Sequence, residues 1–544
     1  MVGKTHVPLS GSSREKNPNA LPVGKVNPKN PVKVTIGLRG PDFPGTYELI
    51  GQRMSPKELK EKFSAREDDT DKVEKCLNKF GLNVEKTFLE TRIMHVSGTA
   101  KAMEAAFKPQ WEMMRSPTYG LYRGRKGKIQ IPKELEGIVT GVFGLDERRM
   151  AHRRSGAAVS VGPGTALKPL SPKKIEEHYK FPVGKGEGQS IAVAEFGGGY
   201  FAADMKKYCK KFRRPMPKVK RIEVGRGRAY TFKQLLDISD PELRHRILDE
   251  SFEVMMDVEI IGGLCPKADI TVYFSTFDQD GWINLLNEIY YANPVPVALS
   301  ISWGRAEDSI QWSDGAVDAI NDLLYQFSKK DITVCAASGD DGARDEVYDG
   351  LPHVDFPASS PYVLGVGGTM LEKSGSTVKE VVWWEDPGPW GCATGHGISR
   401  KFQKRPVWQN VQVAKGKRVI KRGRLVPDVS ALAGEPYYDL VFANFPWADG
   451  KTSASVAVWA ALIARINAKL PHNQRQRFLT PLLYNIMSKR KTGGKASFRD
   501  IKSFPDSIVV NNKLHIPTPG FDLMTGWGVP HGKNLLKYLK QVIT

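Results

Sequence analysis

Long hydrophobic runs are missing from this 544-residue chain. No stretch approaches the roughly 20 consecutive apolar residues that a membrane-spanning helix needs. The amino-terminal segment MVGKTHVPLSGSSREKNPNALPVGK also lacks the apolar core of a secretory signal. The sequence therefore predicts no membrane anchor and gives no support for export by an ordinary signal peptide.

Cysteine is scarce, and the residues present are scattered. The chain has five, an odd number, and none stand at spacings typical of a metal site. Cys335 lies in an apolar segment, where a small buried residue is expected. The sequence thus predicts neither a disulfide framework nor a zinc site.

Acidic residues are too few to balance the basic ones. There are 80 Lys and Arg residues against 59 Asp and Glu, which gives a formal net charge of +21 at pH 7. Residues 399–424 contain many of the basic side chains and no acid. Such a run can bind an anionic polymer or a membrane surface, but it is more often a solvated loop. No nucleic-acid motif accompanies it, so we expect neither nucleic acid nor membrane as a partner.

Composition divides the chain into four parts. Residues 1–30 are rich in Pro, Gly, Asn and Lys and are expected to form a poorly ordered arm. Residues 31–147 resemble a small α/β domain, and residues 170–544 a larger one. Between them, residues 148–169 are basic, then small and Gly-rich, without periodicity. This linker is either a plain tether or a joint that is cut during processing.

Hydrophobic periodicity predicts the elements of both domains. In the first domain we expect strands at 32–39, 84–96 and 128–131, and helices at 55–63, 71–80, 99–107 and 132–143. In the second we expect strands at 190–195, 270–274, 297–302, 332–337 and 362–366, and helices at 202–212, 241–264, 282–292 and 316–328. Near-continuous apolar strands that alternate with helices indicate a parallel sheet covered on both faces.

The segment 449–468, DGKTSASVAVWAALIARINA, predicts a loop that feeds a buried helix. Ser453 near the start of this helix has two interpretations. It is a helix cap, a role that Ser often takes, or it is a nucleophile. The second role suits the position because the amide-rich end of a helix stabilises a developing negative charge.

Three carboxylates stand in suggestive places. Glu253 and Asp257 are four residues apart on one predicted helix, so they share a face within an apolar surround. They form either an exposed polar stripe or a buried pair that shares protons. Asp340 follows the strand 332–337, at the sheet edge where ligands of open α/β sheets bind. It is either an ordinary turn residue or a protonated acid that donates a hydrogen bond to an oxyanion.

Several motifs occur in an order typical of one peptidase family. They are EVMMD at 253–257, SISWG at 300–304, SGD at 338–340 and TSAS at 452–455, together with AEFGGGY at 194–200, HVDFPASSPY at 353–362, VGGT at 366–369 and PDV at 427–429. On these residues the chain resembles the sedolisins, or serine-carboxyl peptidases, and their kumamolisin-type members above all. The resemblance covers the amino-terminal domain, which is similar to the family's propeptide, and nearly all of residues 164–544.

The resemblance implies a subtilisin-like fold, with a parallel sheet and helices on both faces, preceded by a ferredoxin-like α/β prodomain. It implies that Ser453 is the nucleophile, Glu253 its general base and acid, Asp257 the group that orients Glu253, Asp340 the oxyanion donor, and Glu195 and Trp303 extensions of the hydrogen-bond network. A Glu–Asp pair suits acidic conditions, where a catalytic His is charged and useless as a base.

The family also carries a calcium site near its carboxyl terminus. The matching residues here are Asp500, Ile501, Thr518, Gly520 and Asp522. Two carboxylates with backbone carbonyl groups of the other three residues supply the oxygen ligands that calcium prefers. Without the resemblance, the two acids are ordinary loop residues.

Two residues beside Ser453 depart from the family pattern. Lys451 stands where Gly is usual and Ala457 where Pro is usual. Glycine in that place allows close backbone approach or a positive φ, which Lys does not adopt freely. An inactive or weak peptide-binding protein therefore remains an alternative to an active peptidase. A third alternative, a Ser-His-Asp hydrolase using His353 or His396, finds no recognisable triad setting.

The resemblance favours a monomeric, self-processing zymogen of an acid-acting endopeptidase. Its expected partners are peptide or protein substrates and its own prodomain, and its expected cofactor is calcium. An acid-acting enzyme is expected outside the cell or in an acidic compartment, although the chain shows no ordinary signal peptide.

Overall fold

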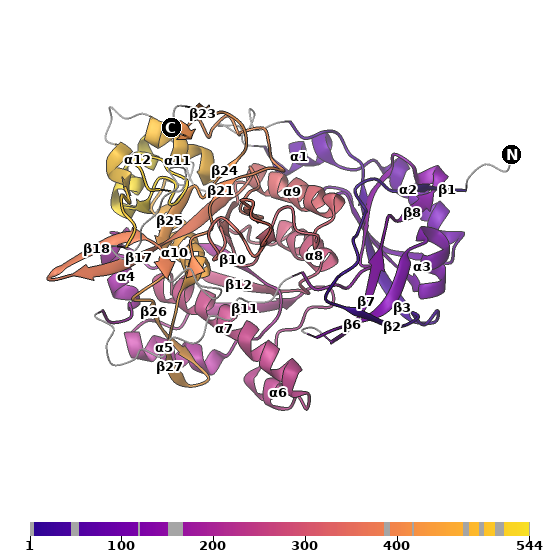
Figure 1. Cartoon of the computed structure of the whole chain (residues 1–544), viewed down its shortest axis with the longest axis horizontal. Helices are drawn as coiled ribbons and strands as arrows, with labels where there is room; N and C mark the ends of the chain where they lie inside the picture. Colours follow the sequence, from indigo (N-terminus) through magenta and orange to yellow (C-terminus); the bar gives the residue numbers. More distant parts are fainter. Residues whose placement is uncertain are drawn as a thin grey trace.

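A computed structural model describes residues 5–44, 54–117, 120–150, 167–385, 392–415, 418–471, 478–488, 494–505 and 516–542. Two domains lie side by side, an amino-terminal one in indigo and purple and a larger one in magenta to yellow (Figure 1). Within these described ranges, no helix is long and apolar enough to cross a membrane.

The larger domain is built on an eight-stranded sheet. Seven of its strands follow one another in the order β11 (Lys218–Glu223), β12 (Asp269–Phe274), β10 (Ser190–Glu195), β13 (Ala298–Ile301), β15 (Thr333–Ala337), β17 (Leu364–Ser374) and β18 (Thr377–Val382), and β25 (Val429–Leu432) also pairs with β17. All pairs are parallel except β17–β18, which is an antiparallel hairpin. The predicted parallel sheet is confirmed.

Helices cover both faces of this sheet. On one face lie α8 (Gln279–Tyr290) and α9 (Asp314–Lys329), and on the other α7 (Pro241–Leu264) and α10 (Lys451–Asn467). Side chains alternate between the faces of a strand. In β10, Ile191 and Val193 accordingly join the core of α7 and α10, whereas Ala192 and Ala194 join the core of α8 and α9.

The remaining helices of the larger domain are peripheral. They are α4 (Pro172–His178), α5 (Ala202–Phe212), α6 (Phe232–Leu236), α11 (Leu479–Ser488) and α12 (Gly532–Val542). Short antiparallel pairs complete the domain: β14 (Arg305–Ala306) with β16 (Asp355–Phe356), β19 (Trp384–Glu385) with β20 (Cys392–Ala393), β21 (Gly397–Ile398) with β24 (Leu425–Val426), β22 (Val413–Lys415) with β23 (Arg418–Ile420), β26 (Tyr438–Phe442) with β27 (Phe445–Asp449), and β28 (Phe498–Arg499) with β29 (Val529–Pro530).

The helix α10 is the centre of the larger domain. All 17 of its residues are buried, and it packs against α7 and against the strands β13, β15, β17 and β25. A helix that is apolar all round is expected in a core rather than at a surface. Ser453 lies in the first turn of this helix, as the sequence predicted.

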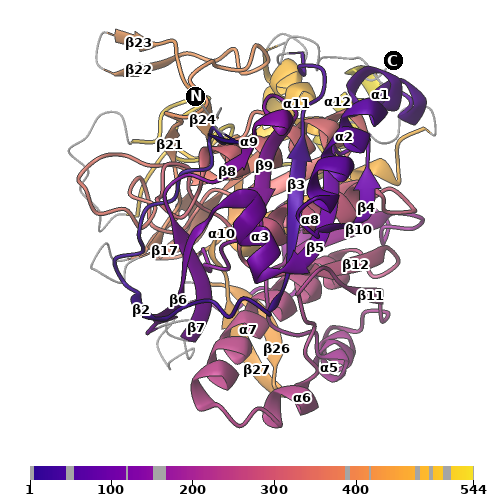
Figure 2. The same ribbon diagram turned by 90° about the vertical axis from the view of Figure 1, so that its right-hand side faces the viewer.

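The amino-terminal domain has a four-stranded antiparallel sheet in the order β4 (Asn83–Phe88), β5 (Ile93–Thr99), β3 (Pro31–Leu38) and β9 (Val139–Phe143). The helices α1 (Pro56–Phe63) and α2 (Glu67–Asn78) follow β3, and α3 (Ala100–Phe107) follows β5. This order is that of a ferredoxin-like unit, and Figure 2 views the domain face-on. A second sheet joins β2 (Leu21–Gly24), β6 (Gln110–Ser116) and β7 (Gly120–Lys126).

Two predictions in this domain were wrong in type or extent. Residues 132–143 do not form a helix: a short 3-10 turn, Lys133–Leu135, is followed by the strand β9. Gly137 takes a left-handed φ of 72° between them, and Val139 and Val142 favour an extended chain. The predicted strand 84–96 is divided into β4 and β5.

The prediction of a poorly ordered arm at residues 1–30 was also wrong for the part that the structure describes. The strand β1 (His6–Pro8) pairs with β8 (Gln130–Pro132), and β2 pairs with β6. Leu9 is buried in the domain core, and Arg14 forms an ion pair of 3.1 Å with Asp146. Strand pairing satisfies backbone groups that composition alone suggested would be left to water.

The amino-terminal sheet docks on α8 and α9. Thr35 donates from Oγ1 to Asn284 Oδ1 at 3.0 Å, and His95 Nε2 contacts the same oxygen at 2.8 Å. Thr91 Oγ1 donates to Asn287 Oδ1 at 2.6 Å. Phe143 belongs to the apolar cluster of α8 and α9, so polar and apolar contacts both join the domains.

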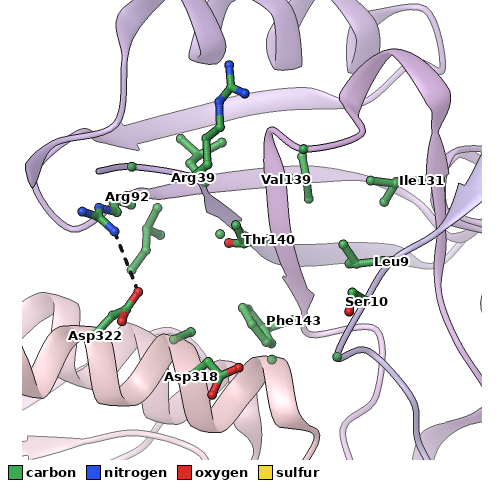
Figure 3. Close-up of a pocket in the computed structure, with 18 of the residues that line it drawn as sticks. Leu9, Ser10, Arg39, Arg92, Ile131, Val139, Thr140, Phe143, Asp318 and Asp322 are labelled. Carbon is green, nitrogen blue, oxygen red and sulfur yellow. Dashed lines mark ion pairs between the residues drawn. The ribbon is translucent and has the colours of Figure 1, made fainter. Parts of the chain in front are cut away.

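A cavity of about 580 Å³ lies at this interface. Figure 3 shows its wall, with Arg92 from the amino-terminal domain directed towards Asp322 of α9, whereas the guanidinium of Arg39 points away from α9 and pairs with Asp69. Arg92 Nη1 lies 3.9 Å from Asp322 Oδ2. Burial raises the pKa of Asp322 to about 7, although Arg92 opposes the shift. The cavity lies away from Ser453 and is part of the docking surface.

The basic stretch 399–424 is only partly a solvated loop. Lys421 and Arg422 are exposed, but Arg424 is fully buried and its Nη2 lies 2.5 Å from Asp428 Oδ2. Asp428 also accepts from Tyr484 Oη at 2.7 Å. The interpretation from charge alone missed this buried ion pair.

All five cysteines are free thiols. Cys76, Cys209, Cys265 and Cys335 are buried, and Cys392 is partly exposed. Burial raises the pKa of Cys265 to about 12 and that of Cys209 to about 11. These thiols therefore stay protonated and act as small apolar residues.

We predict that Arg424→Met destabilises the larger domain by about 3–5 kcal/mol, because it leaves the Asp428 carboxylate buried without its cation. Denaturant unfolding of the purified variant measures this loss. The control is Arg422→Met, which removes an exposed charge two residues away and is expected to change stability by less than about 0.5 kcal/mol. Equal stability of both variants contradicts the prediction.

Candidate active site

Asp340 lies at the amino-terminal end of α10, beside Ser453. Its Oδ1 accepts hydrogen bonds from the backbone N of Thr452 at 3.1 Å and from Thr452 Oγ1 at 2.6 Å. Asp340 belongs to the turn that follows β15, at the carboxyl edge of the sheet. Ser453 is buried, with 5% of its surface exposed. The structure therefore brings together Asp340 and Thr452, which are 112 positions apart in the sequence.

The helix α7 carries Glu253 and Asp257 against α10. The two residues are 3% and 0% exposed, so they are not a solvated polar stripe. Ser302 donates from Oγ to Asp257 Oδ2 at 2.6 Å. Asp257 is thereby linked to the loop that follows β13. The sequence analysis left two alternatives for this pair, and the structure supports the buried one.

Glu195 and Trp303 contact each other directly. Trp303 Nε1 donates to Glu195 Oε2 at 2.8 Å, and both side chains are buried. Glu195 ends β10 and Trp303 follows β13. Because the carboxyl ends of parallel strands meet at one edge of a sheet, this edge gathers Glu195, Trp303 and Asp340.

Lys451 takes a left-handed conformation, with φ of 72°. Its backbone N donates to Ala433 O at 2.6 Å. A non-Gly residue in this region carries strain of roughly 1–3 kcal/mol, so Lys451 holds a conformation that suits the glycine usual in related peptidases. Ala457 lies within α10 and is fully buried.

The sequence analysis gave no role to Ser302 or Thr452, although both stand inside the motifs that it quoted. The sequence feature that could have identified Ser302 and Thr452 was their position next to Trp303 and Ser453. His353, one of the alternative triad histidines, uses Nδ1 and Nε2 to contact Asp308 at 2.7 Å and Asp349 at 2.8 Å. No ring nitrogen of His353 remains to activate a serine.

The end of the amino-terminal domain also reaches this edge of the sheet. Arg149 Nη2 donates to Phe196 O at 3.1 Å and to Glu250 Oε1 at 2.5 Å. Met150 N donates to Phe277 O at 2.9 Å. These two residues belong to the predicted processing segment, 148–169, whose residues 151–166 lie outside the described ranges.

The five predicted calcium ligands lie in two adjoining loops. Gly520 N donates to Asp500 Oδ2 at 3.0 Å, and Thr518 N donates to Asp522 Oδ2 at 3.3 Å. Asp500 Oδ1 is buried without a hydrogen-bond partner among the residues described. Ile501, the fifth residue, is buried directly after Asp500.

These loops fit a divalent cation with oxygen ligands. Burial raises the pKa of Asp500, and burial together with the Asp500 charge raises the pKa of Asp522 to about 7. The buried carboxylate of Asp522 and the half-buried carboxylate of Asp500 gain most from a cation that both can bind. Within the described ranges, no cluster of three or more His, Cys, Asp or Glu side chains is arranged for a metal. A cation here therefore depends on backbone carbonyl groups as well as on the two carboxylates.

Comparison with known proteins agrees with this geometry. The family described as "Pro-kumamolisin, activation domain" matches residues 18–148. Kumamolisin of Bacillus sp. (strain MN-32) is 31% identical over 554 residues, which cover 98% of this chain and 96% of that protein. Tripeptidyl-peptidase sed5 of Aspergillus fumigatus is 24% identical over 601 residues, which cover 98% of this chain and 97% of that protein.

Among solved structures, Pseudomonas sedolisin, a serine-carboxyl proteinase complexed with pseudo-iodotyrostatin, matches with a TM-score of 0.57. The match is 21% identical and covers 70% of this chain and 99% of that structure, so it supports the fold. The larger domain thus has the subtilisin-like fold of a serine-carboxyl peptidase. The chain belongs to the sedolisin family, is kumamolisin-like, and carries its own activation domain.

Proposed function

We propose that this protein is a self-processing zymogen of an acid-acting serine-carboxyl endopeptidase. The observation that carries the proposal is the position of Asp340 against Thr452, beside Ser453, at the end of a buried helix that packs on α7. The α7 residues Glu253 and Asp257 are the only acids that the proposal needs besides Asp340.

In the proposed mechanism, Ser453 Oγ attacks the scissile carbonyl carbon. Glu253 takes the proton from Oγ and later returns it to the leaving amine. Asp257 orients Glu253 and is itself oriented by the hydroxyl of Ser302, 2.6 Å away. Asp340, when protonated, donates to the oxyanion, and the amino-terminal end of α10 adds its dipole.

The proposed catalyst works in acid because its carboxyl groups must hold protons at defined steps. Glu253 and Asp257 lie on one buried face, so removing both protons places two negative charges in a poorly solvated site. We therefore propose that the enzyme acts outside the cell or in an acidic compartment.

The amino-terminal domain is proposed to inhibit the enzyme until acid loosens it. Glu147 spans the interface, with its Oε1 3.2 Å from Arg226 Nη1 of the larger domain. The neighbouring acid, Asp146, instead pairs with Arg14 and Arg148 of its own domain. Although burial opposes the shift, these cations keep the pKa of Asp146 below its usual value.

His95 is a group by which acid is proposed to weaken docking. Burial lowers its pKa, although the contact with Asn284 opposes the shift. A lowered pKa means that the docked domain binds fewer protons than the free domain. The contribution of neutral His95 to docking is therefore full above its ordinary pKa of about 6.5 and is lost as the pH falls below it.

Two carboxyl groups at the interface act in the opposite direction. Burial raises the pKa of Asp322 to about 7 and that of Asp280, with the help of Asp278, to about 6. Protonation of such groups favours the docked state as the pH falls. Acid release thus requires that the effect of His95 outweighs the effects of Asp280 and Asp322.

A catalytically weak, peptide-binding protein is the second candidate. It is favoured by the strained φ of Lys451, two residues before Ser453. Such a protein needs the same fold and the same docking surface, and it differs only in turnover.

Calcium is proposed as a structural ion held by the carboxylates of Asp500 and Asp522 and by the carbonyl groups of Ile501, Thr518 and Gly520. The ion would neutralise the buried charge of Asp522 and the half-buried charge of Asp500 and would join two loops, so its effect is on stability.

We predict that Ser453→Ala abolishes peptide cleavage without unfolding the protein. Glu253→Gln and Asp340→Asn should each lower kcat by about a hundredfold or more, because they remove the proposed acid–base and oxyanion groups. Initial rates on a denatured protein at acidic pH measure these losses, and circular dichroism checks the fold.

Matched controls exist on the same two helices. Ser455→Ala removes a buried hydroxyl that bonds to Ala431 O and Leu432 O, and Glu259→Gln removes a buried acid that accepts from Val441 N. Both are expected to keep more than about a third of the rate, since neither group is proposed to touch substrate. Wild-type rates in Ser453→Ala contradict the nucleophile assignment.

We predict that chelation of calcium lowers the melting temperature of the larger domain, since a ligand bound only by the native state stabilises it. With the ion removed, the raised pKa of Asp522 means that stability falls as the pH rises from acid towards 7. The loss on chelation should therefore be greater near neutral pH than in acid.

Asp500→Asn should abolish the difference in melting temperature between calcium and chelator, whereas Asp439→Ala, at an ion pair elsewhere, should preserve it. An unchanged melting temperature on chelation ends the assignment.

We predict that acidification makes the full-length protein cut itself within residues 148–169, and that Ser453→Ala blocks this cut. His95→Gln should move the midpoint of processing to lower pH, because the variant cannot gain the buried charge that weakens docking. Mass spectrometry of samples held at a series of pH values gives both the cut site and the midpoint. His6→Gln is the control, since His6 lies on β1, away from α8. The same midpoint for both His variants removes His95 from the mechanism.

A further inference from the structure

Arg149 and Met150 are held by the larger domain as a bound peptide would be. Besides the bonds of Arg149 to Phe196 and Glu250, Met150 contributes both of its backbone groups. Its N donates to Phe277 O, and its O accepts from Arg305 Nη1, each at 2.9 Å. The Met150 side chain is 1% exposed and joins the apolar cluster of Phe196, Phe277 and Trp303.

These contacts lie along the edge of the sheet that carries the proposed catalytic groups. Phe196 follows β10, Phe277 follows β12, and Arg305 follows β13. Glu250 lies on α7, three residues before Glu253. The start of the linker in which processing is predicted thus passes the carboxyl ends of three adjacent strands.

The carboxylate of Glu250 is buried and held in a fixed position. It is 3% exposed, and its Oε2 accepts from Gly198 N at 3.1 Å. Gly197 takes a φ of 147°, and a Cβ at this residue would lie only 2.0 Å from Glu250 Oε2. The two glycines therefore let the backbone close on one carboxylate oxygen, while the other oxygen meets Arg149.

The charges around Glu250 come from two elements. Arg149 of the linker pairs with it at 2.5 Å, and Arg246 of α7 lies at 3.9 Å. Burial raises the pKa of Glu250; the two Arg residues oppose this shift, and Asp249 of α7 adds to it. Of these groups, only Arg149 leaves with the amino-terminal domain.

We propose that Glu250 forms a subsite for a basic side chain of the substrate, and that Arg149 fills this subsite in the zymogen. The proposal rests on the peptidase function proposed above. Removal of Arg149 leaves a buried carboxylate short of a cation, which is costly. A substrate Arg or Lys restores the pair. A cut within the linker after Met150 would place Arg149 on the amino-terminal side of the scissile bond, so the basic residue is proposed to lie on that side.

The test compares substrates cleaved by the acid-activated wild-type enzyme. A peptide library first identifies the position at which Arg or Lys is enriched. Paired peptides then carry either Arg or its neutral isostere citrulline at that position. We expect kcat/KM to be about tenfold or more higher for the Arg peptide, which is the worth of one charge-assisted hydrogen bond. In Glu250→Gln this ratio should fall below about threefold.

Two further readouts separate a subsite from a structural role. The Arg:citrulline ratio should rise with pH, because only ionised Glu250 attracts the guanidinium. Arg246→Gln, which removes the neighbouring cation on the same helix, should keep the ratio or increase it. A purely structural Glu250 predicts equal losses for both peptides in Glu250→Gln and no change in their ratio.

Each outcome decides the proposal. A ratio that depends on Glu250 supports it. Cleavage without preference for a basic residue, or an unchanged ratio in Glu250→Gln, overturns the subsite and leaves the peptidase function standing. No cleavage of any library peptide overturns the peptidase function and the subsite together.

Discussion

The structure depends on one buried helix and on what its amino-terminal amides require. Every residue of α10 is buried, so the free N–H groups of its first turn cannot rely on water. Ala433 O accepts from Lys451 N, and Asp340 accepts from Thr452 N. The bond that satisfies the helix thus also places a carboxylic acid beside Ser453. The same contact therefore serves both the stability of α10 and the proposed chemistry. Around it lie the sheet edge, α7 and the hairpin β26–β27.

Much of the larger domain was predictable because local signals agreed with each other. The helix α7 was predicted with its observed ends, since Asp240 caps it and Pro241 opens it. The fold and the family were recognised from the order of short motifs, which the comparison with kumamolisin supports. The roles of the catalytic residues stay a prediction. The same reasoning gave wrong results where tertiary contacts decide, as in β9 and in the arm that pairs with β6 and β8.

The contacts that connect distant residues could not be derived from the sequence. Thr452 and Asp340 are 112 positions apart, and no local pattern states that they meet. Burial of Arg424 was hidden within a run of exposed basic residues. The roles of Asp146 and His95 depend on which side chains face them across or within a domain. These contacts are set by tertiary packing, which composition and periodicity describe only on average.

The path of the linker has a consequence for the timing of activation. Arg149 and Met150 precede residues 151–166, so a cut in that segment leaves both residues attached to the released domain. The severed domain keeps its tail along the sheet edge, and the docking contacts of Thr35 and Thr91 do not depend on an intact chain. Breaking the peptide bond and freeing the enzyme are therefore separate events. In the proposed activation, the cleaved complex is an intermediate with its own lifetime, and the lag before full turnover measures dissociation rather than bond cleavage.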